Sequence, residues 1–471
     1  MQKYDLCVIG TGPAGQMAAI EAAKLGKRVC AIERMQTIGG VAINTGTIPS
    51  KALREAILRV TGKESVAPRY VDFQAARNAV LQDIQGSVHS VIRNEINIIS
   101  QHFRRYGVET IFGTGEFADD NTLVVRGVNG DSQIAADRFV IAVGTVPAEP
   151  DTIEFDNSSI VTSDGILNLP TLPKSLIVVG GGVIGTEYAS MFAALGVDVT
   201  LIEGQHRLLP FVDGEIVEAL QYQLRRTGLT LRMGEKVVSI RKVAPTQAYH
   251  ATDGSMVEAM LESGKTLRSD CLLYAIGRQG ATEELKLDNV GLKTDKRGRL
   301  AVNENFQTDR EHIYACGDVI GFPALASTSM EQGRFAACHM FGKCVEKADD
   351  LLPYGIYAVP EISMVGWTEE KLTEEGIPFE SGKAMYSDIA RGQLIGDDIG
   401  MLKILIHQES RTVLGVHVIG TGATELVHIG QVAIAFKATV DYFINTVFNY
   451  PTLAECYKVA ARNALDKLRM N

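Results

Sequence analysis

KYDLCVIGTGPAGQMAAIEAAKLGKRVCAIE at residues 3–33 is matched by SLIVVGGGVIGTEYASMFAALGVDVTLIE at residues 175–203. Each stretch has an apolar run, a G-x-G-x-x-G loop, a helical run and a second apolar run ending in an acid 23 residues after the first glycine. This order predicts a βαβ unit that binds a dinucleotide, because glycines let the backbone turn tightly and approach a pyrophosphate. The alternative is that both stretches are ordinary βα turns. The strand, glycines, helix and acid occurring together twice favour nucleotide binding over that alternative. The residues are Gly10, Gly12, Gly15 and Glu33 in the first copy, and Gly180, Gly182, Gly185 and Glu203 in the second.

Both copies predict the same three elements. In the first we expect a strand over 3–9, a helix over 16–25 and a strand over 28–33. In the second we expect them over 175–179, 186–195 and 198–203. Two dinucleotide sites in one chain indicate hydride transfer between a nicotinamide and a flavin.

Composition limits the other classes of function. The chain has 471 residues, 46% of them hydrophobic, which indicates about three domains. A formal net charge of -10 disfavours nucleic acid and anionic membranes as partners. The start leaves no room for a signal peptide, and no apolar run has membrane-spanning length. The seven cysteines form no C-x-x-C and lack histidines at metal spacing, so we expect a cytoplasmic protein with reduced thiols and no metal.

Three further segments carry a family resemblance: GGVAINTGTIPSK at 39–51, YACGD at 314–318 and YPTLAE at 450–455. Together with the glycine loops they resemble the pyridine-nucleotide disulfide oxidoreductases over essentially the whole chain. In that family the first segment carries C-x-x-x-x-C, but the matching positions here are Ala42 and Thr47, which cannot exchange with a disulfide. The family's H-P-T-x-x-E histidine is replaced by Tyr450, and a phenol with a pKa near 10 is a poor base at neutral pH. We therefore expect flavin chemistry without a redox disulfide.

The resemblance implies the order of the sites and the domain organisation. The first site would take FAD and the second the nicotinamide nucleotide, in an α/β fold with two Rossmann-like dinucleotide-binding domains and a C-terminal α/β dimerisation domain. The expected ranges are 1–150 and 276–345 for the FAD domain, 151–275 for the NAD(P) domain and 346–471 for the dimerisation domain. A homodimer is also implied. Within these domains we expect a long helix over 74–105, strands over 138–144, 272–277, 361–367, 401–406 and 413–419, and a helix over 424–437.

The same resemblance implies the site residues. Lys51 would approach the flavin and pair with Glu187, so that an ammonium stabilises negative charge developing on the flavin. Plain helix-surface charges are the alternative. Tyr450 and Glu455 would face the flavin of the partner subunit, and Tyr450 serves equally well as packing. The expected cofactor-binding residues are Gly10, Gly12, Gly15, Glu33, Arg34, Gly40, Thr47, Lys51, Gly115, Gly144, Gly180, Gly182, Gly185, Glu203, Gly277, Asp318 and Ala326.

Within the family, GTIPSK and FNYPT resemble the soluble branch that transfers hydride between NADPH/NADP and NAD/NADH through FAD, by a ping-pong mechanism. That branch usually keeps the first cysteine, whereas Ala42 stands here. Glu203 should repel the 2′-phosphate of NADP(H), which leaves Arg207 and His206 as candidate phosphate ligands. Two alternatives stay open: an NADH-dependent quinone or dye reductase, and a non-catalytic interaction protein that FAD stabilises.

Overall fold

The computed structural model describes residues 2–62, 77–128, 130–244, 256–344, 346 and 351–470. The chain divides into two compact units. Unit 1 comprises Met1–Leu53, Asp83–Pro150 and Ile276–Ala348, and unit 2 comprises Arg54–Gln82, Asp151–Ala275 and Asp349–Asn471. The units meet in the chain at 150/151 and 275/276, among other positions. Residues of the expected NAD(P) and dimerisation ranges both lie in unit 2, and the expected domain ranges stay a prediction.

Unit 1 is built on a parallel sheet in the order β19-β8-β2-β3-β4. Its strands are β19 (Ile313–Ala315), β8 (Phe139–Ile141), β2 (Leu6–Ile9), β3 (Val29–Glu33) and β4 (Glu109–Phe112). A second sheet has the order β1-β7-β6-β5, with β1 (Gln2–Tyr4), β7 (Gly130–Ala136), β6 (Thr122–Gly127) and β5 (Thr114–Asp119). Strands β9 (Thr145–Pro147) and β18 (Arg278–Gly280) form an antiparallel pair.

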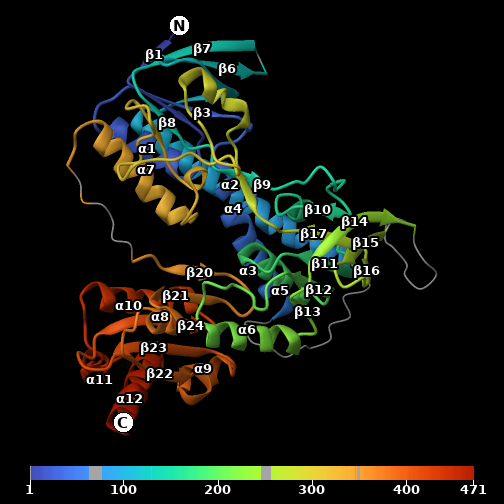
Figure 1. The fold of residues 1–471 in the computed structure, drawn as a ribbon, viewed down its shortest axis with the longest axis vertical. Helices are drawn as coiled ribbons and strands as arrows, with labels where there is room; N and C mark the ends of the chain where they lie inside the picture. Colours follow the sequence, from blue (N-terminus) through green and yellow to red (C-terminus); the bar gives the residue numbers. More distant parts are fainter. Residues whose placement is uncertain are drawn as a thin grey trace. The chain divides into compact units, whose positions relative to one another are not determined.

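The helices of unit 1 are α1 (Pro13–Lys24), α2 (Gly40–Asn44) and α7 (Ala326–Met340), with short 3-10 turns at Glu283–Leu285, Leu287–Val290 and Asp318–Ile320. Helices α3 (Thr47–Thr61) and α4 (Arg77–Tyr106) each have residues in both units. Figure 1 shows α1 and α7 lying side by side, and a Cβ on Gly333 of α7 would meet the carbonyl oxygen of Ala14 at 2.1 Å. Only glycine allows that close approach.

Unit 2 repeats the plan with a parallel sheet in the order β10-β17-β11-β12-β13. These strands are β10 (Ile160–Val161), β17 (Cys271–Tyr274), β11 (Ser175–Val179), β12 (Asp198–Glu203) and β13 (Thr230–Met233), accompanied by helices α5 (Val183–Ala194) and α6 (Gly214–Arg226) and a 3-10 turn at Ile166–Asn168. An antiparallel sheet of β14 (Val237–Val243), β15 (Met256–Leu261) and β16 (Thr266–Ser269) follows. In both parallel sheets the strand before the glycine loop lies inside the sheet: β2 lies between β8 and β3, and β11 lies between β17 and β12.

The remaining part of unit 2 is an antiparallel sheet in the order β20-β21-β24-β23-β22. Helix α10 packs on β21 and β24, and α12 packs on β22 and β23. The strands are β20 (Tyr354–Ile356), β21 (Ile362–Gly366), β22 (Phe379–Met385), β23 (Met401–His407) and β24 (Val413–Ile419); the helices are α8 (Glu369–Glu374), α9 (Ala390–Ile395), α10 (Ala423–Ala435), α11 (Val440–Asn445) and α12 (Glu455–Met470), with a 3-10 turn at Tyr386–Asp388.

Several sequence expectations need correction in their bounds. The strand expected over 3–9 is split at Asp5, whose carboxylate accepts from the backbone N–H of Arg28 at 2.7 Å, so that β1 and β2 join different sheets. Helix α1 begins at Pro13 rather than Gln16, because proline suits a first helical turn. The strand expected over 138–144 ends at Ile141, and the left-handed backbone of Gly144 (φ +66°) follows it. Residues 74–76 of the expected long helix lie outside the described residues.

Candidate nucleotide-binding and hydride-transfer site

Each glycine of the first loop has a different structural role: a left-handed backbone turn, close packing of the helix, or an open backbone surface. Gly10 adopts φ +101°, which residues with a side chain rarely do. A Cβ on Gly15 would lie 2.0 Å from the carbonyl oxygen of Gly10, so α1 packs directly on the loop. A Cβ on Gly12 would meet nothing within 4 Å, which leaves the backbone open to an incoming group. Together with the start of α1 at Pro13, this open cradle fits a pyrophosphate.

The second glycine loop repeats that geometry in unit 2. Gly180 adopts φ +109°, and a Cβ on Gly185 would lie 1.8 Å from the carbonyl oxygen of Gly180. Gly182, like Gly12, has open space where a Cβ would stand. The residues present therefore fit two dinucleotides.

The two acids are held in the same way. One carboxylate oxygen of Glu33 accepts from the backbone N–H of Thr11 at 3.3 Å, and the other accepts from Met35 N–H at 2.9 Å. The carboxylate of Glu203 accepts from Gly181 N–H at 2.5 Å and from Gln205 N–H at 2.8 Å. Each carboxylate thus ties the glycine loop to the end of the following strand. The oxygens that accept from Met35 and from Gln205 each have one donor and keep a lone pair for a ribose hydroxyl.

The segment that lacks the cysteines lies against the first loop. Gly40 begins α2 with φ +57°, and a Cβ there would lie 2.8 Å from the Cα atom of Gly12. Ala42 lies on α2, while Thr47 begins α3 and Lys51 follows one turn later. The Lys51 ammonium donates to the hydroxyl of Ser50 at 3.2 Å.

Lys51 belongs to unit 1 and Glu187 to unit 2, so their pairing stays a prediction. Glu187 lies on α5 with 3% of its surface exposed, and its carboxylate accepts from Tyr357 N–H at 2.8 Å. Three residues further, the Ser190 hydroxyl accepts from Val359 N–H at 3.0 Å. These bonds attach the residues before β21 to the helix that follows the second glycine loop.

Other expected cofactor residues lie around the unit 1 sheet. Gly317 packs on Ala14 at the start of α1, which brings the next residue, Asp318, close to the first glycine loop. Burial raises the pKa of Asp318, although the charges of two arginines oppose the shift. Arg34 forms a long ion pair with Glu284 at 3.7 Å. Of the rest, Gly115 packs on Ile32, Ala326 begins α7, and Gly144 and Gly277 adopt positive φ on either side of the β9–β18 pair.

The C-terminal residues are placed differently from one another. Tyr450 is a largely exposed aromatic side chain, with 69% of its surface accessible. Glu455 begins α12, and its Oε2 atom is buried without a hydrogen-bond partner among the described residues. Their proposed position beside a partner's flavin stays a prediction.

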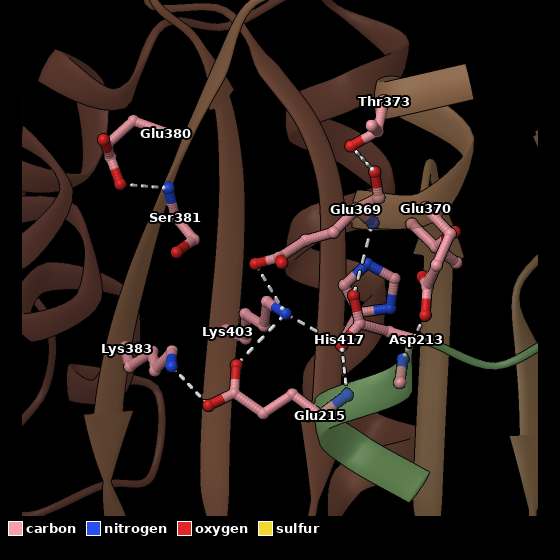
Figure 2. Close-up of polar contacts among 12 residues, drawn as sticks. Asp213, Glu215, Glu369, Glu370, Thr373, Glu380, Ser381, Lys383, Lys403 and His417 are labelled. Atoms are coloured by element: carbon pink, nitrogen blue, oxygen red, sulfur yellow. Dashed lines mark hydrogen bonds and ion pairs between the residues drawn. The ribbon is translucent and has the colours of Figure 1, made fainter. Parts of the chain in front are cut away.

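An ionic cluster in unit 2 was not expected from the sequence (Figure 2). Lys403 of β23 is 1% exposed, and its ammonium contacts Asp213 at 2.8 Å, Glu369 at 2.8 Å and Glu215 at 3.1 Å. Burial acts to lower the pKa of Lys403, but the carboxylates outweigh it and raise the pKa. Burial likewise acts to raise the pKa of Asp213, yet nearby His417 and Lys403 bring it below its usual value. A lysine within the apolar run MLKILIH was the only signal, and it did not identify partners up to 190 residues away.

Asp213 also caps α6, accepting from Glu215 N–H at 3.2 Å and from Glu369 N–H at 3.4 Å. Beside it, Glu370 accepts from Arg207 at 3.0 Å and from Gly214 N–H at 2.9 Å. The Arg207 guanidinium donates further to the carbonyl oxygen of Pro210 at 2.6 Å. The loop after β12 is therefore fastened to the residues at the start of α8.

Comparison with protein families gives two matches. The pyridine nucleotide-disulphide oxidoreductase model matches residues 4–333, and the dimerisation domain of the same family matches residues 352–461. The chain belongs to this family. The predicted α/β fold class and the family resemblance are thereby confirmed, and the dimerisation domain supports a homodimer.

Full-length relatives are similar throughout. The soluble pyridine nucleotide transhydrogenase of Mycobacterium bovis is 46% identical over 471 residues, covering 100% of this chain and 98% of the relative. The protein of that name from Photobacterium profundum is 43% identical over 470 residues, covering 99% and 98%. The predicted branch of the family is therefore confirmed.

Among solved structures, the HOCl-induced flavoprotein disulfide reductase RclA from Escherichia coli is similar, with a TM-score of 0.85, 27% identity, and coverage of 98% of this chain and 99% of that one. The family implies binding of FAD and a nicotinamide nucleotide. None of the helices in the described ranges combines the length and apolar character needed to cross a membrane.

Proposed function

We propose that this chain transfers hydride between NADPH/NADP and NAD/NADH by a ping-pong mechanism that uses no redox disulfide. The proposal is carried by the pair of matching glycine loops, one in each unit. Beside the first loop, Ala42 and Thr47 stand where disulfide reductases have cysteines. FAD, bound at the first loop, supplies the hydride acceptor and donor. The names and full-length similarity of the transhydrogenase relatives support this function.

The roles of this chain's residues follow from their chemistry. Glu33 would bind the FAD ribose and Glu203 the ribose of the nicotinamide nucleotide, each through a carboxylate that the backbone already orients. Lys51 would place positive charge where negative charge develops, with Glu187 as its counter-charge. Helix α7, which begins at Ala326, would add the positive end of its dipole near the flavin.

The remaining roles concern the C-terminal part. Tyr450 would cover the flavin of the partner subunit. Glu455 would accept a hydrogen bond through its Oε2 atom, which has no partner among the described residues. Nicotinamide nucleotides bound one after the other at the second loop need only one site, which agrees with the two loops counted.

The test is anaerobic mixing of the FAD-loaded protein with NADPH, followed by NAD. We expect the flavin absorbance to bleach and then recover, and the reverse order of nucleotides should behave alike. Bleaching that recovers only with a quinone or dye would instead identify a reductase of that type. No bleaching with either nucleotide would indicate a non-catalytic protein.

A second arm tests the absence of dithiol chemistry. Six of the seven cysteines are buried and Cys344 is exposed, and none forms a disulfide. Alkylating the accessible thiols should leave flavin bleaching by NADH intact, and the protein should reduce neither lipoamide nor glutathione disulfide. Loss of bleaching in protein that remains folded would contradict the mechanism.

A further inference from the structure

The turn between β13 and β14 (residues 234–236) lies at the carboxyl edge of the unit 2 parallel sheet. There β13 pairs with β12, with Met233 opposite Glu203. Two backbone hydrogen bonds extend the contact past the strand ends: Gly234 N–H donates to the carbonyl of Gln205 at 2.9 Å, and Glu235 N–H donates to that of Glu203 at 3.1 Å. Ligands of open α/β sheets bind beyond this edge. The turn is therefore fixed beside the place where a nucleotide ribose would lie.

Lys236 reaches the end of β12 from this turn. A Cβ on Gly204, the residue after Glu203, would lie 3.3 Å from Cγ and 3.7 Å from Cε of Lys236. The aliphatic part of Lys236 thus runs along Gly204, in space that a side chain at position 204 would need. Lys236 is exposed, and its stem reaches the residue that follows Glu203, the acid expected to bind the ribose.

The nucleotide 2′-phosphate needs such a cation. Glu203 accepts readily from a ribose hydroxyl but repels a phosphate that bears roughly two negative charges. Of the two candidates that the sequence offered, Arg207 already donates to Glu370 and to the carbonyl of Pro210. The ring of the second, His206, lies against Gly234, where a Cβ would be 3.1 Å from Nδ1. Within the described part of the chain, Lys236 forms no ion pair with a carboxylate.

We propose that Lys236 binds the 2′-phosphate of NADP(H), and that this contact lets a loop built around Glu203 accept both nicotinamide nucleotides. The proposal rests on the function proposed above. It names the residue that distinguishes NADP(H) from NAD(H). Lysine suits the role because its ammonium is a single point charge on a flexible stem. It can approach the phosphate of NADP(H) and turn to solvent when NAD(H) is bound.

The experiment measures binding rather than activity. The FAD-loaded protein is titrated by calorimetry with adenosine 2′,5′-bisphosphate and with adenosine 5′-monophosphate, which differ only in the 2′-phosphate. Lys236→Gln should weaken the bisphosphate about ten-fold, the size expected for one exposed ammonium facing a doubly charged phosphate, and leave the monophosphate unchanged. Lys236→Arg should retain the bisphosphate. Lys265→Gln is the matched control, because Lys265 is an exposed lysine in the β15–β16 turn of the same unit.

Raising the salt concentration should weaken bisphosphate binding more in the wild type than in Lys236→Gln, because exposed charges are screened. Unchanged bisphosphate binding in Lys236→Gln overturns the proposal. So does equal weakening of both ligands in a variant whose melting temperature is that of the wild type. If the wild type passes no hydride between nucleotides but Lys236→Gln still loses the bisphosphate selectively, the proposed function fails and the site stands.

Discussion

Replacing Lys403 with methionine should destabilise unit 2 by removing the cation at the centre of its ionic cluster. Methionine retains much of the length and apolar character of the lysine stem, so the change removes charge with little loss of packing. Asp213 is 1% exposed and cannot turn to solvent. Glu215 keeps Lys383 as a second partner, and Glu369 is 38% exposed, so both of these carboxylates can relax.

The expected cost follows from these differences. Leaving a buried charge without its partner costs about 3 to 5 kcal/mol. Since only Asp213 is fully trapped, and since two backbone N–H groups still donate to it, we expect the lower end, about 3 kcal/mol. That is roughly two decades in the unfolding equilibrium.

Trp367 makes the assay local. It is the only tryptophan in the chain, and its carbonyl oxygen contacts the His417 ring at 2.9 Å, beside the cluster. Urea unfolding followed by tryptophan fluorescence should give a lower midpoint for Lys403→Met. Lys371→Met is the matched control: Lys371 also pairs with carboxylates, Glu374 and Glu375, but it is 47% exposed, so this change should lower stability far less than Lys403→Met.

A double variant separates charge from packing. Lys403→Met with Asp213→Asn should recover part of the lost stability, because the neutral amide is less costly to bury than an unpaired carboxylate. An unfolding midpoint for Lys403→Met equal to that of the wild type would refute the reasoning. The ammonium would then not offset the cost of burying the Asp213 carboxylate. A loss no larger than that of Lys371→Met would have the same meaning.

The remaining predictions concern the proposed site and its pH dependence. Lys51→Met should retain FAD but slow flavin bleaching by NADH about 100-fold or more, as expected for one preorganised charge, and a stopped-flow rate like the wild type would remove Lys51 from the mechanism. Glu203→Ala should weaken NADH and shift preference toward NADPH by about one to two decades, measured by bleaching at varied nucleotide concentration; an unchanged ratio would mean that Glu203 does not contact the ribose. Burial lowers the pKa of His417 below its usual 6.5, so the unfolded chain takes up this proton first, and stability should be full above pH 6.5 and decline below it. Urea midpoints of His417→Gln should lack that decline; an identical pH profile would assign it to other groups.

The sequence predicted the bounds of those strands that coincide with a continuous apolar run. Strands β11, β12 and β24 have the bounds expected, because continuous apolar runs end at glycine or at a charge. Asp5 divided one expected strand by forming a side-chain bond to a residue 23 positions away, which no local pattern reports.

The candidate site was predictable where a motif specifies it and not where distant charges meet. The spacing predicted Glu33 and Glu203 as ribose ligands, and that role stays a prediction. The hydrogen bonds that tie both carboxylates to the preceding glycine loops are seen only in the structure. Lys236 carries no motif; its place follows from the pairing of β13 with β12 and from the missing side chain at Gly204. The partners of Lys403 come from separate segments of the chain, so folding alone brings them together.

The cluster around Lys403 limits how this protein can be re-engineered. Residues 151–275 look like a removable cassette in the sequence, yet Asp213 inside that range is neutralised by a lysine of β23 outside it. Exchanging the cassette with that of a relative would bury an acid, a base or both without a partner unless the matching residues of β23 and α8 are exchanged too. Chimeras designed to alter nucleotide preference should therefore exchange all partners of each ion pair together, even where the partners lie outside residues 151–275.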